Sequence, residues 1–184
     1  MTIEAAISRS NKVVCDLVWP TIKPLVCDLL AVPDLEIIAA ETEGSSMAQT
    51  LDMNAGVDIL LRDPRRQAVW TVATRVQYSG DYQSFTIRSR TGWGNSRTEL
   101  LKRAEAIASD STYPQLTLQA YTAGGSRLLS AAIIATRSLY NYVGHPEAYT
   151  RTNHVDGSQF LIIDWSLIHP SHIRIATPTR EEMQ

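Results

Sequence analysis

The alternation of apolar and polar residues is clearest between residues 56 and 90. An apolar side chain at every second position gives a strand one apolar and one more polar face. Three runs show this period, and they predict three strands, at residues 57–61, 68–78 and 84–90. Together they predict an antiparallel three-strand core at about residues 56–90.

The faces of these strands predict their register. Gly80-Asp81 suits a two-residue hairpin, which would place Val76 opposite Phe85 and keep apolar residues on one face. Matching faces in the preceding pair places Leu61 opposite Trp70. The shared polar face is then expected to collect five side chains: Asp58, Arg75, Gln77, Thr86 and Arg88.

Helical spacing of apolar residues appears on both sides of this core. A helix is predicted at residues 3–19, ended or kinked by Pro20, and a second at 23–30. Ser96 and Glu99 have the spacing of a capping box at the start of a third helix. Further elements are expected as a strand near 35–42, a loop at 43–54, strands at 116–120, 128–135 and 160–165, and a helix at 137–143. The order predicts an α/β (α+β) fold with a central mixed sheet flanked by helices.

Positive charge is concentrated in the same part of the chain. Residues 62–103 carry nine basic residues and three acids, a formal +6, whereas the whole chain of 184 residues is −2. Segregated positive charge is typical of proteins that bind a polyanion, most often nucleic acid. A solvated basic surface without a partner is the alternative. Arginine exceeds lysine 14 to 3, and guanidinium groups bind phosphate in a bidentate manner.

The length is consistent with one domain at residues 1–176 followed by a flexible tail at 177–184. We expect a cytoplasmic protein, because the N-terminus lacks the regions of a signal peptide and no apolar run is long enough to span a bilayer. Cys15 and Cys27 lie in apolar helical surroundings, which favours reduced thiols.

The segment AGVDILL…AVWTVATRVQ resembles the PD-(D/E)XK nuclease-like family, across roughly residues 36–120. The resemblance implies a restriction-endonuclease-like fold and Mg²⁺-dependent cleavage of DNA. Asp58 corresponds to the metal-binding Asp of the family, whereas Ala73 and Arg75 stand where the family has an acid and a lysine. Ala73 cannot bind metal, and a guanidinium does not act as a base.

Roles for individual residues follow from this resemblance. Asp58 would hold Mg²⁺ with a second carboxylate, supplied by Glu41, Glu43 or Asp52. Arg75 would stabilise charge on the scissile phosphate, and Gln77 would orient metal or water. An Asp58 that pairs with Arg75 or Arg88 is the structural alternative. The residues expected to contact nucleic acid are Arg62, Arg65, Arg66, Arg88, Arg90, Trp93 and Arg97.

Three functions remain open at this point. The first is a metal-dependent nuclease acting on DNA. The second is a catalytically inactive nucleic-acid-binding or adaptor module of the same fold, favoured by the absence of an acid at Ala73. The third is a structural subunit, in a homodimer or with another protein, whose arginine-rich face docks an acidic partner.

Overall fold

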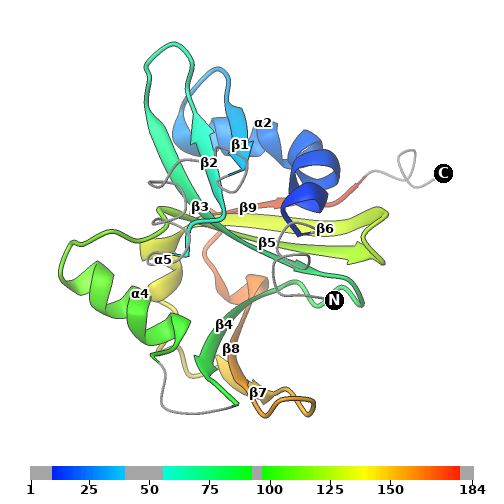
Figure 1. Ribbon diagram of the computed structural model, residues 1–184, viewed down its shortest axis with the longest axis vertical. Coiled ribbons are helices and arrows are strands. Elements are labelled where there is room, and N and C mark those ends of the chain that lie inside the picture. Colours follow the sequence, from blue (N-terminus) through cyan, green and yellow to red (C-terminus); the bar gives the residue numbers. More distant parts are fainter. Residues whose placement is uncertain (1–9, 40–55, 93–96, 179–184) are drawn as a thin grey trace.

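The computed structural model describes residues 10–39, 56–92 and 97–178. It contains two sheets and a helical layer (Figure 1). The six-stranded sheet has the order β1-β2-β3-β5-β6-β9, and the three-stranded sheet has the order β4-β8-β7. The strands are β1 Glu36–Ala39, β2 Ile59–Arg62, β3 Val69–Gln77, β4 Ser84–Arg90, β5 Leu116–Ala123, β6 Arg127–Ala135, β7 Tyr149–Thr152, β8 Gln159–Asp164 and β9 Ile173–Ala176. The expected mixed α+β fold is confirmed.

The N-terminal helical segment continues past Pro20, so Pro20 does not end the helix. A π-helical turn, η1 (Val14–Val18), leads directly into α2 (Trp19–Leu30), which carries Pro20 in its first turn and Pro24 inside. Both prolines lack the N–H that a helix interior donates, and Pro20 lies just after the wider i→i+5 turn of η1. Ala31, in a left-handed conformation at φ 52°, ends the helix.

The six-stranded sheet separates two hydrophobic cores. Residues at alternate positions of β5, such as Leu118 and Ala120, pack with α2 on one face of the sheet. Tyr121 lies on the other face and packs against Phe85 of β4 and Ile163 of β8. The layers are therefore helix, large sheet and small sheet (Figure 1). Short helices α4 (Glu99–Ala108) and α5 (Thr136–Tyr140) and the 3₁₀ turn η2 (Trp165–Leu167) complete the fold.

The predicted hairpin at Gly80-Asp81 is wrong. Strand β3 pairs with β2 through residues 69–72 and with β5 through residues 72–77, whereas β4 pairs with β8 in the other sheet. The segment between β3 and β4 instead crosses from one sheet to the other. Gly80 has φ 73° there, and the Asp81 carboxylate accepts a hydrogen bond from the Ser130 hydroxyl of β6 at 2.6 Å.

The register of the earlier strand pair is confirmed. Ile59 lies opposite Val72, and Leu61 lies opposite Trp70. The antiparallel meander is therefore β1-β2-β3 rather than three strands within residues 56–90, and β1 falls inside the predicted 35–42 strand. Strands β7 and β9 were not predicted. The α5 helix ends at Tyr140, earlier than expected, and the residues that follow form turns.

Candidate nucleic-acid pocket

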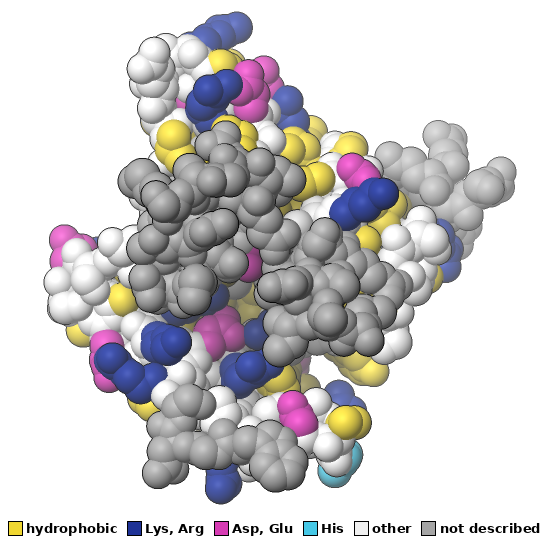
Figure 2. Space-filling model, viewed as in Figure 1, with side chains coloured by type: hydrophobic (Ala, Val, Ile, Leu, Met, Phe, Trp, Pro, Cys, Tyr) yellow, Lys and Arg dark blue, Asp and Glu magenta, His cyan; other side chains and the backbone are white. Residues whose placement is uncertain are grey.

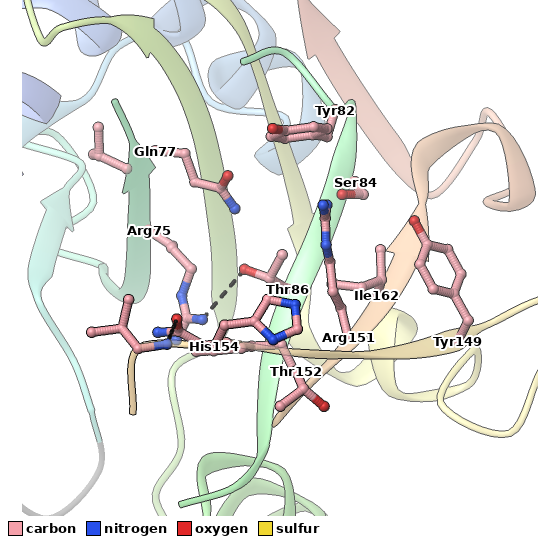
Figure 3. A pocket seen from close by; sticks show the side chains of 14 residues that line it. Arg75, Gln77, Tyr82, Ser84, Thr86, Tyr149, Arg151, Thr152, His154 and Ile162 are labelled. Atoms are coloured by element: carbon pink, nitrogen blue, oxygen red, sulfur yellow. Dashed lines mark hydrogen bonds between the residues drawn. The ribbon is translucent and has the colours of Figure 1, made fainter. Parts of the chain in front are cut away.

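A cavity of about 540 Å³ lies between the end of β3 and the small sheet. One wall is β3, with Arg75 and Gln77, and the other walls come from β4, β7 and β8. Figure 3 shows both β3 side chains extending toward the strand that carries Thr86. The remaining lining residues are Val76, Tyr82, Ser84, Tyr149, Arg151, Thr152, Asn153, His154, Val155, Phe160 and Ile162.

The cavity exists because β3 and β4 belong to different sheets. Paired strands lie about 5 Å apart and leave no space between them, whereas here the chain leaves the large sheet after Gln77 and joins the small sheet at Ser84. The expected grouping of Arg75, Gln77 and Thr86 is thus present, but across a cavity rather than along a hairpin. Asp58 and Arg88 are not among the lining residues.

Arg75 is held in place by three contacts. Its Nη2 donates to Glu99 Oε2 at 2.8 Å, its Nη1 donates to Thr86 Oγ1 at 3.3 Å, and its guanidinium lies 5.2 Å from the centre of the Phe160 ring. Thr86 in turn donates to Oε1 of the buried Gln119 at 3.1 Å. Arg75 is therefore a fixed part of the cavity floor whose charge is shared with a carboxylate.

Glu99 is the acid at the centre of this cluster. Sequence reasoning treated it as a capping residue, but Thr98 is the N-cap of α4, and Ser96 lies outside the described residues. The Glu99 side chain, 21% exposed, also accepts from Arg103 Nη1 at 2.7 Å and from the Arg88 amide at 3.3 Å. Burial disfavours the carboxylate, but Arg75, Arg103 and the Arg88 amide together lower the pKa of Glu99 below its ordinary value.

Arg151 is the cation that enters the cavity without a carboxylate. Its guanidinium lies over the Tyr82 ring, 5.6 Å from the ring centre, and Figure 3 shows the Arg151 side chain extending toward that ring. Within the described residues Arg151 makes no ion pair, in contrast to Arg62, Arg75, Arg97 and Arg103. Neither Asp nor Glu occurs among the described lining residues. The cavity therefore favours an anionic ligand.

Asp58 closes the end of a strand. Its Oδ2 accepts hydrogen bonds from the amide and hydroxyl groups of Thr74, at the point where β2 stops covering the edge of β3. Ala73 lies on β3, and its side chain offers no atom that could bind a metal. Glu41, Glu43 and Asp52 lie outside the described residues. Across the described parts of the chain, no group of three or more His, Cys, Asp and Glu side chains could hold a metal ion.

The arginines expected to form one basic surface lie in two regions. Arg62, Arg65 and Arg66 lie at the β2–β3 end of the molecule, whereas Arg88 and Arg90 belong to β4 in the small sheet (Figure 1). Basic and acidic side chains are interspersed on the visible lower half of the surface (Figure 2). The separation follows from β3 and β4 entering different sheets.

Several of these arginines are paired with acidic side chains and therefore do not form a free basic surface. Arg62 pairs with Glu36 of β1, and Arg97 pairs with Glu105 of α4. The buried Asp63 carboxylate accepts the amides of Arg65 and Arg66 and so forms the β2–β3 turn, which leaves the Arg66 side chain 65% exposed. Trp93 lies outside the described residues.

Arg151, Tyr82, Tyr149 and Phe160 were not selected as site residues from the sequence. Phe160 lies in the predicted 160–165 strand and Tyr82 lies between strands, whereas β7, which carries Tyr149 and Arg151, has a weak strand pattern. Strand β7 reads as the polar run YTRT, exposed throughout. Its only sequence signal is a cation two residues from an aromatic side chain.

In the described part of the chain, no helix is long and apolar enough to cross a membrane.

Comparison with known proteins finds no matching family model, no matching curated protein and no matching solved structure.

Proposed function

We propose that the protein is a nucleic-acid-binding module that holds its ligand at the cavity between β3 and the small sheet. The observation that carries the proposal is the chemistry of the lining. Arg75, Arg151 and His154 offer cationic or hydrogen-bonding groups, and the described lining contains no carboxylate. The rings of Tyr82, Tyr149 and Phe160 also line the cavity, and Arg75 and Arg88 lie over the Phe160 ring. Proteins that bind single strands combine a positive groove with aromatic side chains in this way.

Arg151 is the phosphate ligand in this proposal, because its charge is not shared with an acid in the described residues. Arg75 has a different role from the one first expected. Glu99 and Thr86 occupy both ends of its guanidinium, so Arg75 shapes the floor and orients Phe160. The exposed Arg65 and Arg66, at the other end of β3, add long-range attraction for the phosphate backbone.

Fluorescence anisotropy with a labelled single-stranded oligonucleotide tests the proposal. We expect binding that weakens steeply between about 50 and 200 mM salt, because neutralised phosphates release counterions. Arg151→Ala should weaken binding and reduce the salt slope by about 0.7 for the lost contact. Arg127→Ala is the matched control, since it removes the same charge from an exposed position at the start of β6.

Two results would contradict the proposal. One is no binding at low salt. The other is an Arg127→Ala variant that loses as much affinity as Arg151→Ala, which would indicate attraction to overall charge without a site.

Metal-dependent cleavage of DNA is the second candidate. It is favoured by the β1-β2-β3 meander followed, through α4, by β5 parallel to β3, with Asp58 at the start of β2. This order agrees with the resemblance to the PD-(D/E)XK family. Its second carboxylate would come from Glu41, Glu43 or Asp52.

A nuclease assay with Mg²⁺ or Mn²⁺ separates the two candidates. The binding module is expected to leave the oligonucleotide intact. Metal-dependent cleavage that is lost in the Asp58→Asn variant would favour the nuclease over the binding module. Asp58→Asn is the informative substitution because it removes the carboxylate charge and keeps an acceptor for Thr74.

A further inference from the structure

Three exposed apolar side chains gather at this cavity. Among the described residues, the large hydrophobic side chains that are most exposed include Tyr82 at 54%, Tyr149 at 49% and Val155 at 93%. All three line the cavity. Exposed apolar groups that cluster at a concave site, rather than scatter over the surface, indicate a ligand with an apolar face.

The two tyrosines approach the cavity from different segments. Tyr82 comes from the crossing between β3 and β4, and Tyr149 comes from the first position of β7 (Figure 3). Tyr82 is braced from behind by Tyr121, whose buried ring meets it edge-on at 6.0 Å between centres. The Tyr82 side chain stays 54% exposed, so part of its ring remains accessible beside Arg151.

Polar groups complete the walls. Arg151 lies over Tyr82 at 5.6 Å, and the Gln77 amide extends into the same space (Figure 3). A planar aromatic ring with hydrogen-bonding edges, joined to a phosphate, has the chemistry that these neighbours complement. A nucleotide unit has this composition, and 540 Å³ lies within the usual range for sites that enclose a small ligand.

We infer that the cavity takes one unpaired base of a nucleic-acid strand, stacked on Tyr82 and Tyr149 with its phosphate at Arg151. The inference rests on the proposed function and names its substrate class. A base inside a duplex cannot enter a concave site without leaving the stack, and unpairing costs free energy. The protein therefore binds single strands in preference to duplexes.

The test compares three ligands of equal length by anisotropy: a single strand, an abasic strand with the same phosphates, and a duplex. We expect the single strand to bind at least about tenfold more tightly than the abasic strand, since stacking on an aromatic side chain contributes about five- to hundredfold in affinity. Tyr82→Ala should remove most of that advantage, so that the single strand and the abasic strand bind with similar affinity. Tyr82→Phe, which keeps the ring, should retain it.

The outcomes distinguish this inference from the proposed function. An abasic strand that binds as tightly as the normal strand overturns base stacking while leaving phosphate binding intact. Equal or tighter binding of the duplex also overturns it. No binding of any ligand removes both. A mononucleotide that competes as well as the oligonucleotide would keep the stacking site but contradict a nucleic-acid ligand. Thermal melts check that the variants fold. We expect them to fold because the Tyr82 side chain is exposed.

Discussion

Glu99→Gln tests whether one carboxylate organises the floor of the cavity. Glu99 contacts Arg75 at 2.8 Å and Arg103 at 2.7 Å, and the side chains of these arginines are 27% and 9% exposed. Glutamine keeps the shape and one acceptor oxygen but removes the charge. Two largely buried guanidinium groups would then lie close together without a counterion.

The expected loss of stability is large for a single substitution. Removing one partner of a fully buried ion pair costs about 3–5 kcal/mol. Glu99 keeps some contact with solvent, so we expect about 2–3 kcal/mol at pH 7. For a chain of this size, that corresponds to a melting temperature about 5–10 °C lower. Differential scanning calorimetry or thermal circular dichroism measures the change.

The loss should also depend on pH. Because the pKa of Glu99 is lowered in the folded state, the stability that its charge supplies is complete above the ordinary glutamate pKa of about 4.3. It disappears as the pH falls through the lowered value. The difference in melting temperature between wild type and Glu99→Gln should therefore be full near pH 7 and shrink below about pH 4.

Glu105→Gln is the matched control on the same helix. Glu105 pairs with Arg97, but their side chains are 54% and 64% exposed, and pairs of this kind contribute about 0–1 kcal/mol. The reasoning is refuted if the two variants melt alike, or if the Glu99→Gln difference stays the same from pH 7 to acid.

Three further predictions address other parts of the molecule. Tyr121→Phe should cost about 1–3 kcal/mol in urea denaturation, because the buried hydroxyl bonds the Ser84 carbonyl at 2.7 Å between the two sheets; an unchanged midpoint would argue against that packing. Cys15 should react with iodoacetamide more slowly than a free cysteine at neutral pH, because burial, followed by the nearby Asp16, raises the pKa of its thiol; mass spectrometry follows the rate, which should increase with pH. Replacing Arg65 and Arg66 with Ala should flatten the salt dependence of single-strand binding by about 0.7 per lost phosphate contact, and an unchanged slope would leave these arginines outside the interface.

The amino-acid sequence determined the structure wherever neighbouring segments pair. The register of β2 and β3 could be predicted because a shift by one residue would turn Leu61 and Trp70 away from the core. The helix that includes Glu99 could also be predicted, because its apolar residues recur at helical spacing. These are interactions between residues close in sequence or on one face of one strand.

Only the tertiary structure decided where β4 goes. Alternation requires an apolar face for Phe85 and Ile87, but this condition is met equally in a hairpin with β3 and in a second sheet packed on the first. Strand β4 pairs with β8 in the small sheet instead of with β3. The same choice separates the arginines of β2 from those of β4.

The site itself was decided in the same way. Arg75 and Gln77 could be selected from sequence because they share a polar strand face, and both line the cavity. Glu99, Tyr82 and Arg151 could not, because each reaches the cluster from a separate segment whose position depends on the crossing between the sheets. The contacts of Arg75 with Glu99 and of Arg151 with Tyr82 form only when packing brings distant segments together, and no local periodicity encodes them.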